Sequence, residues 1–273
     1  NFLCFGQFEI DHYKKLGVKV KNFFKVGSLR LANALHHIKK NKIKLRKFNY
    51  DICLIGEGMP DGNSKFDSPL DGGILAHEKG MVNMIKFTIK FCIKHNMKLI
   101  SAKKISKTEN LNRYNQALNI YKKYLTDDEF NFYIANSIER TVGGHASYIA
   151  MFQSNVSIGN FSTLLNENLA VGGKILSCNL FPTNIHDFPV SGICSIKNCT
   201  FEEFEKRLLQ IYSMSEKDYF ANLDQNKSYL VEYDEKFSTI EILKRKIDSF
   251  LANDLSGEKH ETDNNPFQNI NLK

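Results

Sequence analysis

The chain is predicted to be an α/β protein built on a doubly wound, Rossmann-like parallel sheet. Two observations support this prediction. Short apolar segments alternate with segments of helical periodicity from residue 50 to residue 199, the pattern of a parallel sheet covered by helices. The first of these segments, residues 50–55, is a nearly continuous apolar run, as expected for a strand buried on both sides.

Residues 1–47 are predicted to be the end of an N-terminal Rossmann-like domain, followed by a basic linker. Residues 22–26 have strand composition, Gly27 and Ser28 turn the chain, and Ser28 caps a helix that runs to about Ile38. We expect only this strand and this helix from the first domain, and they cannot form a sheet by themselves. Because the first element begins in mid-course at Asn1, an upstream part of the same domain is expected.

Residues 48–252 are predicted to form a second Rossmann-like domain, and residues 253–273 a disordered tail. A strand at residues 156–159, a helix at 164–171 and a strand at 174–178 form its most regular part. The helix at residues 77–95 has an apolar stripe that should face the sheet, made of Val82, Ile85, Ile89 and Ile93. The other predicted elements are strands at 98–102, 130–135 and 193–196 and helices at 110–124, 148–154, 201–214, 216–223 and 239–252.

Positive charge is concentrated at the N-terminal end, where residues 1–47 contain twelve Lys or Arg and two Asp or Glu. An anionic membrane surface would attract such a segment, and a solvated linker is the other interpretation. Nucleic acid is not expected as a partner, because no recognition motif accompanies the charge. The six cysteines are scattered without a CxxC pair, which indicates reduced, buried thiols and a cytoplasmic location.

A candidate phosphate site lies between the strand at residues 156–159 and the helix that follows it. Asn160, Ser162 and Thr163 occupy the turn, where the first N–H groups of the helix and its positive dipole end point outward. Glu167 lies four residues after Thr163, one turn into the helix, and is suited to accept hydrogen bonds from a ribose or a sugar diol. The alternative is a helix cap made by Ser162 or Thr163, with Glu167 in solvent.

Three further residues are candidates for the same chemistry. Lys103 follows a predicted strand and could neutralise a phosphate at the carboxyl edge of the sheet, although a solvated lysine is the alternative. His145 follows two glycines near a helix start, where an imidazole could donate to a leaving phosphate or act as an acid or base. Glu139 is the second candidate for a catalytic group. No His, Asp or Glu cluster has metal-ligand spacing, so neither a metal nor a cofactor is expected.

Three segments have a resemblance to a known family. They are YDICLI, the strand that ends before Lys103, and above all SYIAMFQSNVSIGNFSTLLNENLAVGGKIL. Together they resemble the C-terminal half of glycosyltransferases of bacterial surface-carbohydrate and capsule biosynthesis that have the GT-B fold. The segment CFGQFEIDHYKKLGVKVKNFFKVGSLR resembles the end of the N-terminal domain of such an enzyme.

The resemblance implies that residues 48–252 bind a nucleotide-activated sugar linked to UDP, CDP or CMP, for transfer to a glycan or a lipid-linked acceptor. Ser162 and Thr163 would face the donor phosphates, with Glu167 on a sugar or ribose hydroxyl. Some members resemble CMP-Kdo or CMP-sialic-acid transferases, in which a histidine near the phosphate would correspond to His145. The catalytic carboxylate of the family belongs to the N-terminal domain, so the catalytic residue stays open.

Two other function classes share these features. A GT-B-like nucleotide-sugar epimerase would have the same phosphate-binding turn with an additional acid and base. A non-catalytic GT-B-like assembly module would keep the fold and lose nucleotide binding. For the chain as given, we expect nucleotide binding without sugar transfer, in the cytoplasm or in peripheral contact with the inner membrane.

Overall fold

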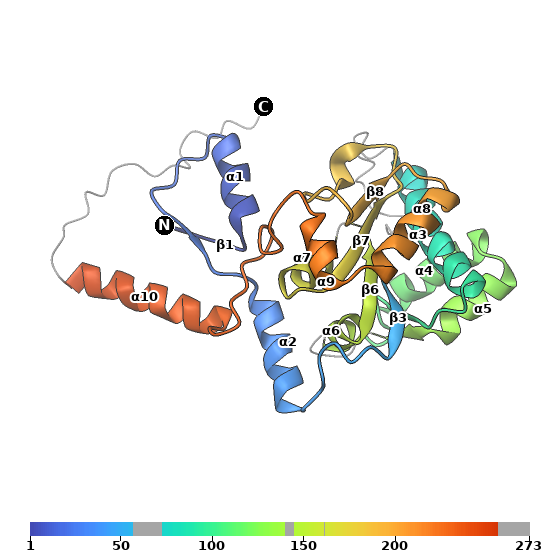
Figure 1. Ribbon diagram of the computed structural model, residues 1–273, viewed down its shortest axis with the longest axis horizontal. Coiled ribbons are helices and arrows are strands. Elements are labelled where there is room, and N and C mark those ends of the chain that lie inside the picture. Colours follow the sequence, from blue (N-terminus) through green and yellow to red (C-terminus); the bar gives the residue numbers. More distant parts are fainter. Residues whose placement is uncertain (57–72, 140–144, 161, 256–273) are drawn as a thin grey trace. The chain divides into compact units, whose positions relative to one another are not determined.

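The structure is a computed structural model, and it describes residues 1–56, 73–139, 145–160 and 162–255 (Figure 1). The chain divides into two compact units. The first unit combines Asn1–Ala32 with Ser228–Lys273, and the second is Asn33–Lys227. This division differs from the predicted one, because residues 228–252 belong with the N-terminal segment and residues 33–47 belong with the larger unit. The predicted disorder of the tail concerns residues that lie almost entirely outside the described ones.

The second unit contains a six-stranded sheet in which every strand pairs parallel to its neighbours. The strand order is β5-β4-β3-β6-β7-β8. This confirms the predicted α/β class and Rossmann-like parallel sheet. The strands are β3 (Tyr50–Ile55), β4 (Leu99–Ala102), β5 (Ser137–Ile138), β6 (Ser154–Gly159), β7 (Lys174–Asn179) and β8 (Ser195–Lys197).

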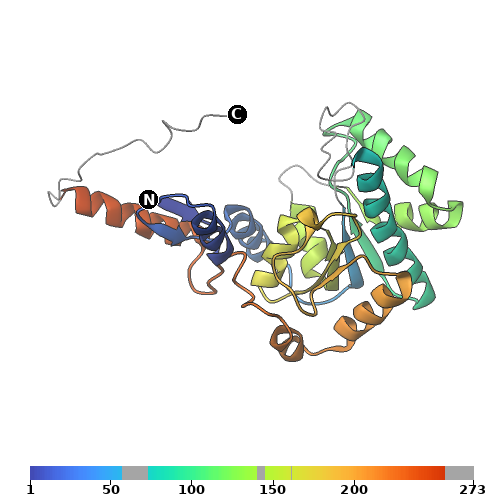
Figure 2. The same cartoon turned by 90° about the horizontal axis from the view of Figure 1, so that it is seen from above.

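Helices cover both faces of this sheet (Figure 2). One layer contains α3 (Gly73–Lys94), α4 (Leu111–Tyr124), α5 (Asp127–Ala135) and α8 (Phe201–Ser213). The opposite layer contains α6 (His145–Phe152), which packs on β3, β4 and β6, and α7 (Thr163–Ala170), which packs on β6 and β7. The short helix α9 (Glu216–Ala221) follows α8.

The apolar stripe of α3 is mostly as predicted. Val82, Ile85 and Ile89 are buried, but Ile93 is 51% exposed and Cys92 is buried in its place. The reason is the helical period of 3.6 residues, which makes spacings of four and three residues alternate along one face. Cys92 therefore continues the stripe after Ile89.

Residues 130–135 are helical, so the predicted strand there is wrong. They belong to α5, which begins at a capping box: the N–H of Glu129 donates to Thr126 Oγ1 (3.2 Å), and the N–H of Thr126 donates to Glu129 Oε2 (2.9 Å). This reciprocal pair satisfies two N–H groups at the helix start and favours helix over the strand tendency of the aromatic residues. The strand of this region, β5, comes directly afterwards and has only two residues.

The first unit contains a small sheet of its own, contrary to the prediction. β1 (Phe2–Cys4) and β2 (Phe23–Lys25) pair in parallel, and α1 (Gln7–Lys15) connects them. The segment that begins at Ser228 completes the unit through two backbone hydrogen bonds. The N–H of Phe8 donates to the carbonyl of Tyr229 (2.9 Å), and the N–H of Glu232 donates to the carbonyl of Phe5 (2.7 Å). The helices of this part are α2 (Leu29–Lys40), which ends in the second unit, and α10 (Thr239–Leu255).

All six thiols are free, and all but the half-buried Cys199 are buried, as the sequence predicted. Burial raises the pKa of Cys53 and of Cys92 to about 12. In the part of the chain that the structure describes, no helix combines the length and the apolar character that crossing a membrane requires.

Candidate functional site

The sheet reverses its winding between β3 and β6. From β3 the chain adds β4 and β5 on one side, and from β6 it adds β7 and β8 on the other. In open α/β sheets, ligands bind beyond the carboxyl ends of the strands at such a reversal. The residues directly after the two central strands are Gly56 and Asn160. The strand order therefore supports a candidate site at the predicted turn of residues 160–163. The sequence pattern predicted the turn but not the strand order.

Asn160 has an unusual environment. The residue is 3% exposed, and its side-chain Oδ1 has no hydrogen-bond partner among the described residues. In the described part of the chain, the hydrogen bond recorded for Asn160 is the one that Ser177 Oγ donates to its backbone carbonyl (3.1 Å). A buried polar atom without a partner costs about 1–3 kcal/mol. A side chain retained at this cost, at the point where the topology places a ligand, is consistent with a role in binding.

The N-terminus of α7 is open beside Asn160. Ser162 occupies the N-cap position with extended backbone, yet its side chain makes no capping hydrogen bond. Within the described residues, the N–H groups of Thr163 and Leu164 have no recorded acceptor, and Thr163 is exposed. The alternative of a side-chain cap is therefore wrong for Ser162. The free N–H groups and the helix dipole form the kind of site that binds a phosphate.

Glu167 is buried, so the alternative of a solvated glutamate is also wrong. It is 3% exposed, and its Oε2 accepts a hydrogen bond from the hydroxyl of Tyr148 (2.7 Å). Because Tyr148 lies on α6, this bond joins the middle of α6 to the middle of α7. Binding of a sugar or ribose hydroxyl by Glu167 stays a prediction.

His145 is the first residue of α6, and its ring stacks on that of His37 with centroids 4.2 Å apart and planes 8° apart. Its Nδ1 is buried without a partner among the described residues. Burial lowers the pKa of His145, and the neighbouring His37 lowers it further. The imidazole is therefore neutral at neutral pH, with one nitrogen able to donate a proton and the other able to accept one.

Lys103 and Glu139 follow β4 and β5, so they lie at the same carboxyl edge as Asn160. Lys103 is 9% exposed and donates from Nζ to the hydroxyl of Tyr114 (3.1 Å), so the solvated alternative does not describe it. Glu139 is half-buried, and its Oε2 accepts from the backbone N–H of Lys107 at 3.4 Å. Sequence reasoning thus selected residues that the fold brings to one edge, after the strands β5, β4 and β6.

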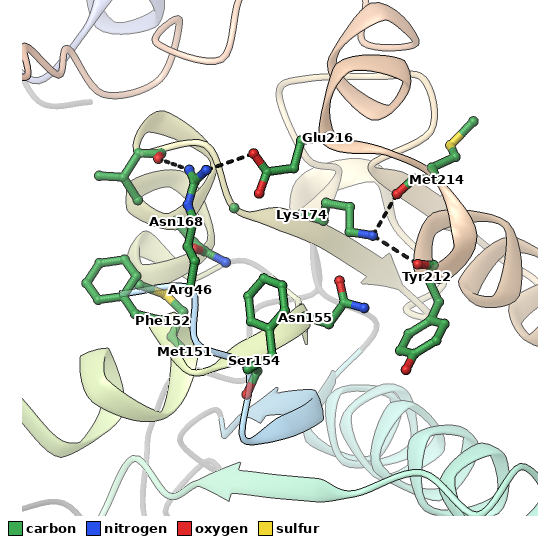
Figure 3. A pocket seen from close by; sticks show the side chains of 13 residues that line it. Arg46, Met151, Phe152, Ser154, Asn155, Asn168, Lys174, Tyr212, Met214 and Glu216 are labelled. Atoms are coloured by element: carbon green, nitrogen blue, oxygen red, sulfur yellow. Dashed lines mark hydrogen bonds and ion pairs between the residues drawn. The ribbon is translucent and has the colours of Figure 1, made fainter. Parts of the chain in front are cut away.

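A pocket of about 270 Å³ opens at the opposite, amino edge of the sheet (Figure 3). Its two cations close helix ends. Arg46 donates to the carbonyl of Val171 at the end of α7 and to Glu216 Oε2 (2.8 Å). Lys174 is 6% exposed and donates at 2.9, 3.0 and 3.0 Å to the carbonyls of Ile211, Tyr212 and Met214. These bonds use all three protons of the Lys174 ammonium, whose pKa is lowered by burial. The pocket is therefore better explained by helix termination than by ligand binding.

The described residues contain no group of three or more His, Cys, Asp or Glu that could hold a metal ion. A scan against protein-family models finds no match to this chain. A search of curated proteins finds no match either. The fold and the site define a doubly wound α/β protein with a candidate anion site at the reversal of its sheet.

Proposed function

We propose that this chain carries the nucleotide-sugar-binding part of a GT-B glycosyltransferase of bacterial surface-polysaccharide biosynthesis. The observation that supports this most directly is the buried Asn160, whose Oδ1 has no hydrogen-bond partner among the described residues, beside the open N-terminus of α7 at the reversal of the sheet. The parallel β1–α1–β2 arrangement in the first unit is a further support, because a GT-B enzyme contains a Rossmann-like part on each side of its cleft.

The chemistry asks for stabilisation of a leaving nucleotide. As the bond to the sugar breaks, negative charge grows on the phosphate, and preorganised donors lower the barrier. The N–H groups of Thr163 and Leu164 and the hydroxyls of Ser162 and Thr163 would meet this charge. The carboxamide of Asn160 can present either its oxygen or its nitrogen, so it can accept from a ribose hydroxyl or donate to the phosphate. No metal ion is required in this scheme.

His145 has a part in the same proposal. Its neutral ring lies at the first residue of α6, and Tyr148 and Glu167 join that helix to α7. A neutral imidazole can donate an N–H to a leaving phosphate, which would favour departure of the nucleotide. The glycan or lipid-linked acceptor and the basic segment's contact with an anionic membrane belong to the same proposal.

The proposal is tested by isothermal calorimetry on the whole chain with UDP, CDP and CMP. At least one nucleotide should bind, and the variant Ser162→Ala/Thr163→Ala should bind it more weakly, by roughly tenfold to a hundredfold for each hydroxyl that contacts the phosphate, since a hydrogen bond to a charged group contributes about 1.5–3 kcal/mol. The control is Ser213→Ala, at the end of α8. Absence of nucleotide binding would favour the assembly module instead, and product analysis with a panel of donors separates a transferase from an epimerase.

A further inference from the structure

Two lysines converge on one tyrosine at the carboxyl end of β4. Lys103 Nζ lies 3.1 Å from the hydroxyl of Tyr114 and 5.1 Å from the centroid of its ring. Lys107 Nζ lies 5.5 Å from the same centroid. Lys103 and Tyr114 are 9% and 5% exposed, whereas Lys107 is exposed. The buried ammonium group of Lys103 thus contacts the hydroxyl of the buried Tyr114, and the exposed Lys107 lies near the same ring.

Neither lysine is balanced by a carboxylate, since no described Asp or Glu oxygen lies within 4 Å of either ammonium. Removing an ammonium from water is costly unless a counter-charge or several hydrogen bonds replace the water. One neutral hydroxyl satisfies one of the three protons of Lys103, and the ring contributes a weak cation–π attraction. Lys174 shows the difference: this buried lysine places all three protons on carbonyls. The charge of Lys103 is therefore incompletely met by the residues that the structure describes.

The surroundings of Lys103 leave room for a small group. A hollow of about 20 Å³ is lined by Lys103, Tyr114, Tyr133 and Gly56, among others. One water molecule needs roughly 10–15 Å³ of this kind of volume, so the hollow takes one or two oxygen atoms of a larger group whose remainder lies outside it. Gly56 comes so close to β4 that a Cβ there would lie 2.8 Å from the carbonyl oxygen of Ala102. The end of β3 therefore borders the hollow directly.

The hollow lies at a defined separation from the proposed phosphate site. β4 and β6 are the two neighbours of β3, and adjacent strands lie about 4.8 Å apart, so the ends of β4 and β6 are about 10 Å apart. A ligand whose phosphate binds at the N-terminus of α7 can reach Lys103 with a second group at that distance.

We propose that Lys103, supported by Tyr114 and Lys107, binds a second oxyanion: a carboxylate on the donor sugar or a phosphate on a sugar acceptor. This inference rests on the proposed function and specifies its substrate class, namely an acidic sugar. The competing explanation is that Lys103 only holds the hydroxyl of Tyr114 in place.

The variant Lys103→Met separates these explanations, with Lys98→Met as the matched control at the exposed, opposite end of the same strand. Calorimetry compares UDP-glucuronic acid with UDP-glucose and CMP-sialic acid with CMP; a third arm titrates glucose 6-phosphate and glucose in the presence of UDP. Lys103→Met should weaken binding of the ligand with the extra carboxylate or sugar phosphate in one arm by about tenfold or more. It should leave binding of the counterpart without that group unchanged, and leave the melting temperature equal or higher. The arm that responds identifies the carboxylate or the phosphate as the source.

Equal weakening of binding for the two ligands of a pair, with and without the extra carboxylate or sugar phosphate, overturns the inference while the proposed function stands. No change in any arm overturns it too. A lower melting temperature without any loss of acidic-ligand affinity shows that Lys103 only supports Tyr114, and likewise overturns it. If no nucleotide binds to the unsubstituted chain, the proposed function fails, and this inference fails with it.

Discussion

Replacing Asn160 by leucine tests whether its buried carboxamide is kept for binding. Leucine has a similar branched shape and no polar atom, so the substitution removes an unpaired group worth about 1–3 kcal/mol of destabilisation. The matched control is Asn168→Leu in α7. Asn168 is also 3% exposed, but its Nδ2 donates to Ser157 Oγ (3.1 Å). Its replacement removes that hydrogen bond and leaves the buried Ser157 hydroxyl with the Cys53 thiol as a weak partner, at a cost of about 1–3 kcal/mol.

The two variants should therefore differ in free energy of unfolding by roughly 2–6 kcal/mol, with Asn160→Leu the more stable. The comparison cancels most of the cost of fitting the larger leucine side chain, which both sites pay. Urea unfolding followed by circular dichroism measures the difference, and a thermal scan should show roughly 2–4 °C for each kcal/mol. Asn160→Leu should also weaken binding of the nucleotide. Equal destabilisation of the two variants, with nucleotide affinity intact, would refute the reasoning.

Three other predictions follow from the structure. Lys174→Met should lower the free energy of unfolding by about 2–4 kcal/mol, because three carbonyls at the end of α8 lose a charged donor; urea unfolding beside Lys98→Met measures this. The pKa of His145 is lowered in the folded chain, so the unfolded chain takes up the proton first as pH falls. Stability should therefore decline below about pH 6.5 and level off below the lowered pKa, and His145→Gln should remove that part of the decline in urea titrations at several pH values. Residues 1–47 should bind vesicles containing phosphatidylserine at low salt and release them above about 0.3 M salt, where screening is strong; equal sedimentation with neutral vesicles would leave the solvated-linker interpretation.

The elements that the sequence predicted well are those with a strong local signal. The strand, turn, helix and strand from β6 to β7 follow from apolar runs closed by glycines. Ser28 was recognised as a helix cap, and its Oγ accepts from the N–H of Leu31 (3.2 Å). β1 and α1 were missed because their signal is weak: β1 has three residues, and Ile10 is the one buried side chain in α1. A helix with a single buried residue shows no apolar stripe.

The candidate site could be found only in part from the sequence. Asn160 and Lys103 were found because each follows a predicted strand and parallel strands end at one edge, whereas Glu139 was selected in a polar turn and the strand before it, β5, was not predicted. The roles of Glu167 and Lys174 depend on partners far along the chain. Tyr148 lies 19 residues before Glu167, and the carbonyls bound by Lys174 lie 37 to 40 residues after it. Charged residues usually face solvent, so no local pattern marks these two as buried.

The six free thiols allow local opening of the structure to be measured without adding a probe. A thiol whose pKa is raised by burial reacts with an alkylating reagent only after the surrounding structure has opened, so its labelling rate measures a local unfolding free energy. Cys4 belongs to the first unit, whereas the other five cysteines belong to the second. Mass spectrometry after timed labelling would therefore resolve the opening of each unit separately in the natural sequence. A ligand that binds between β3 and β6 should slow the labelling of Cys53 in β3 while leaving that of Cys4 unchanged.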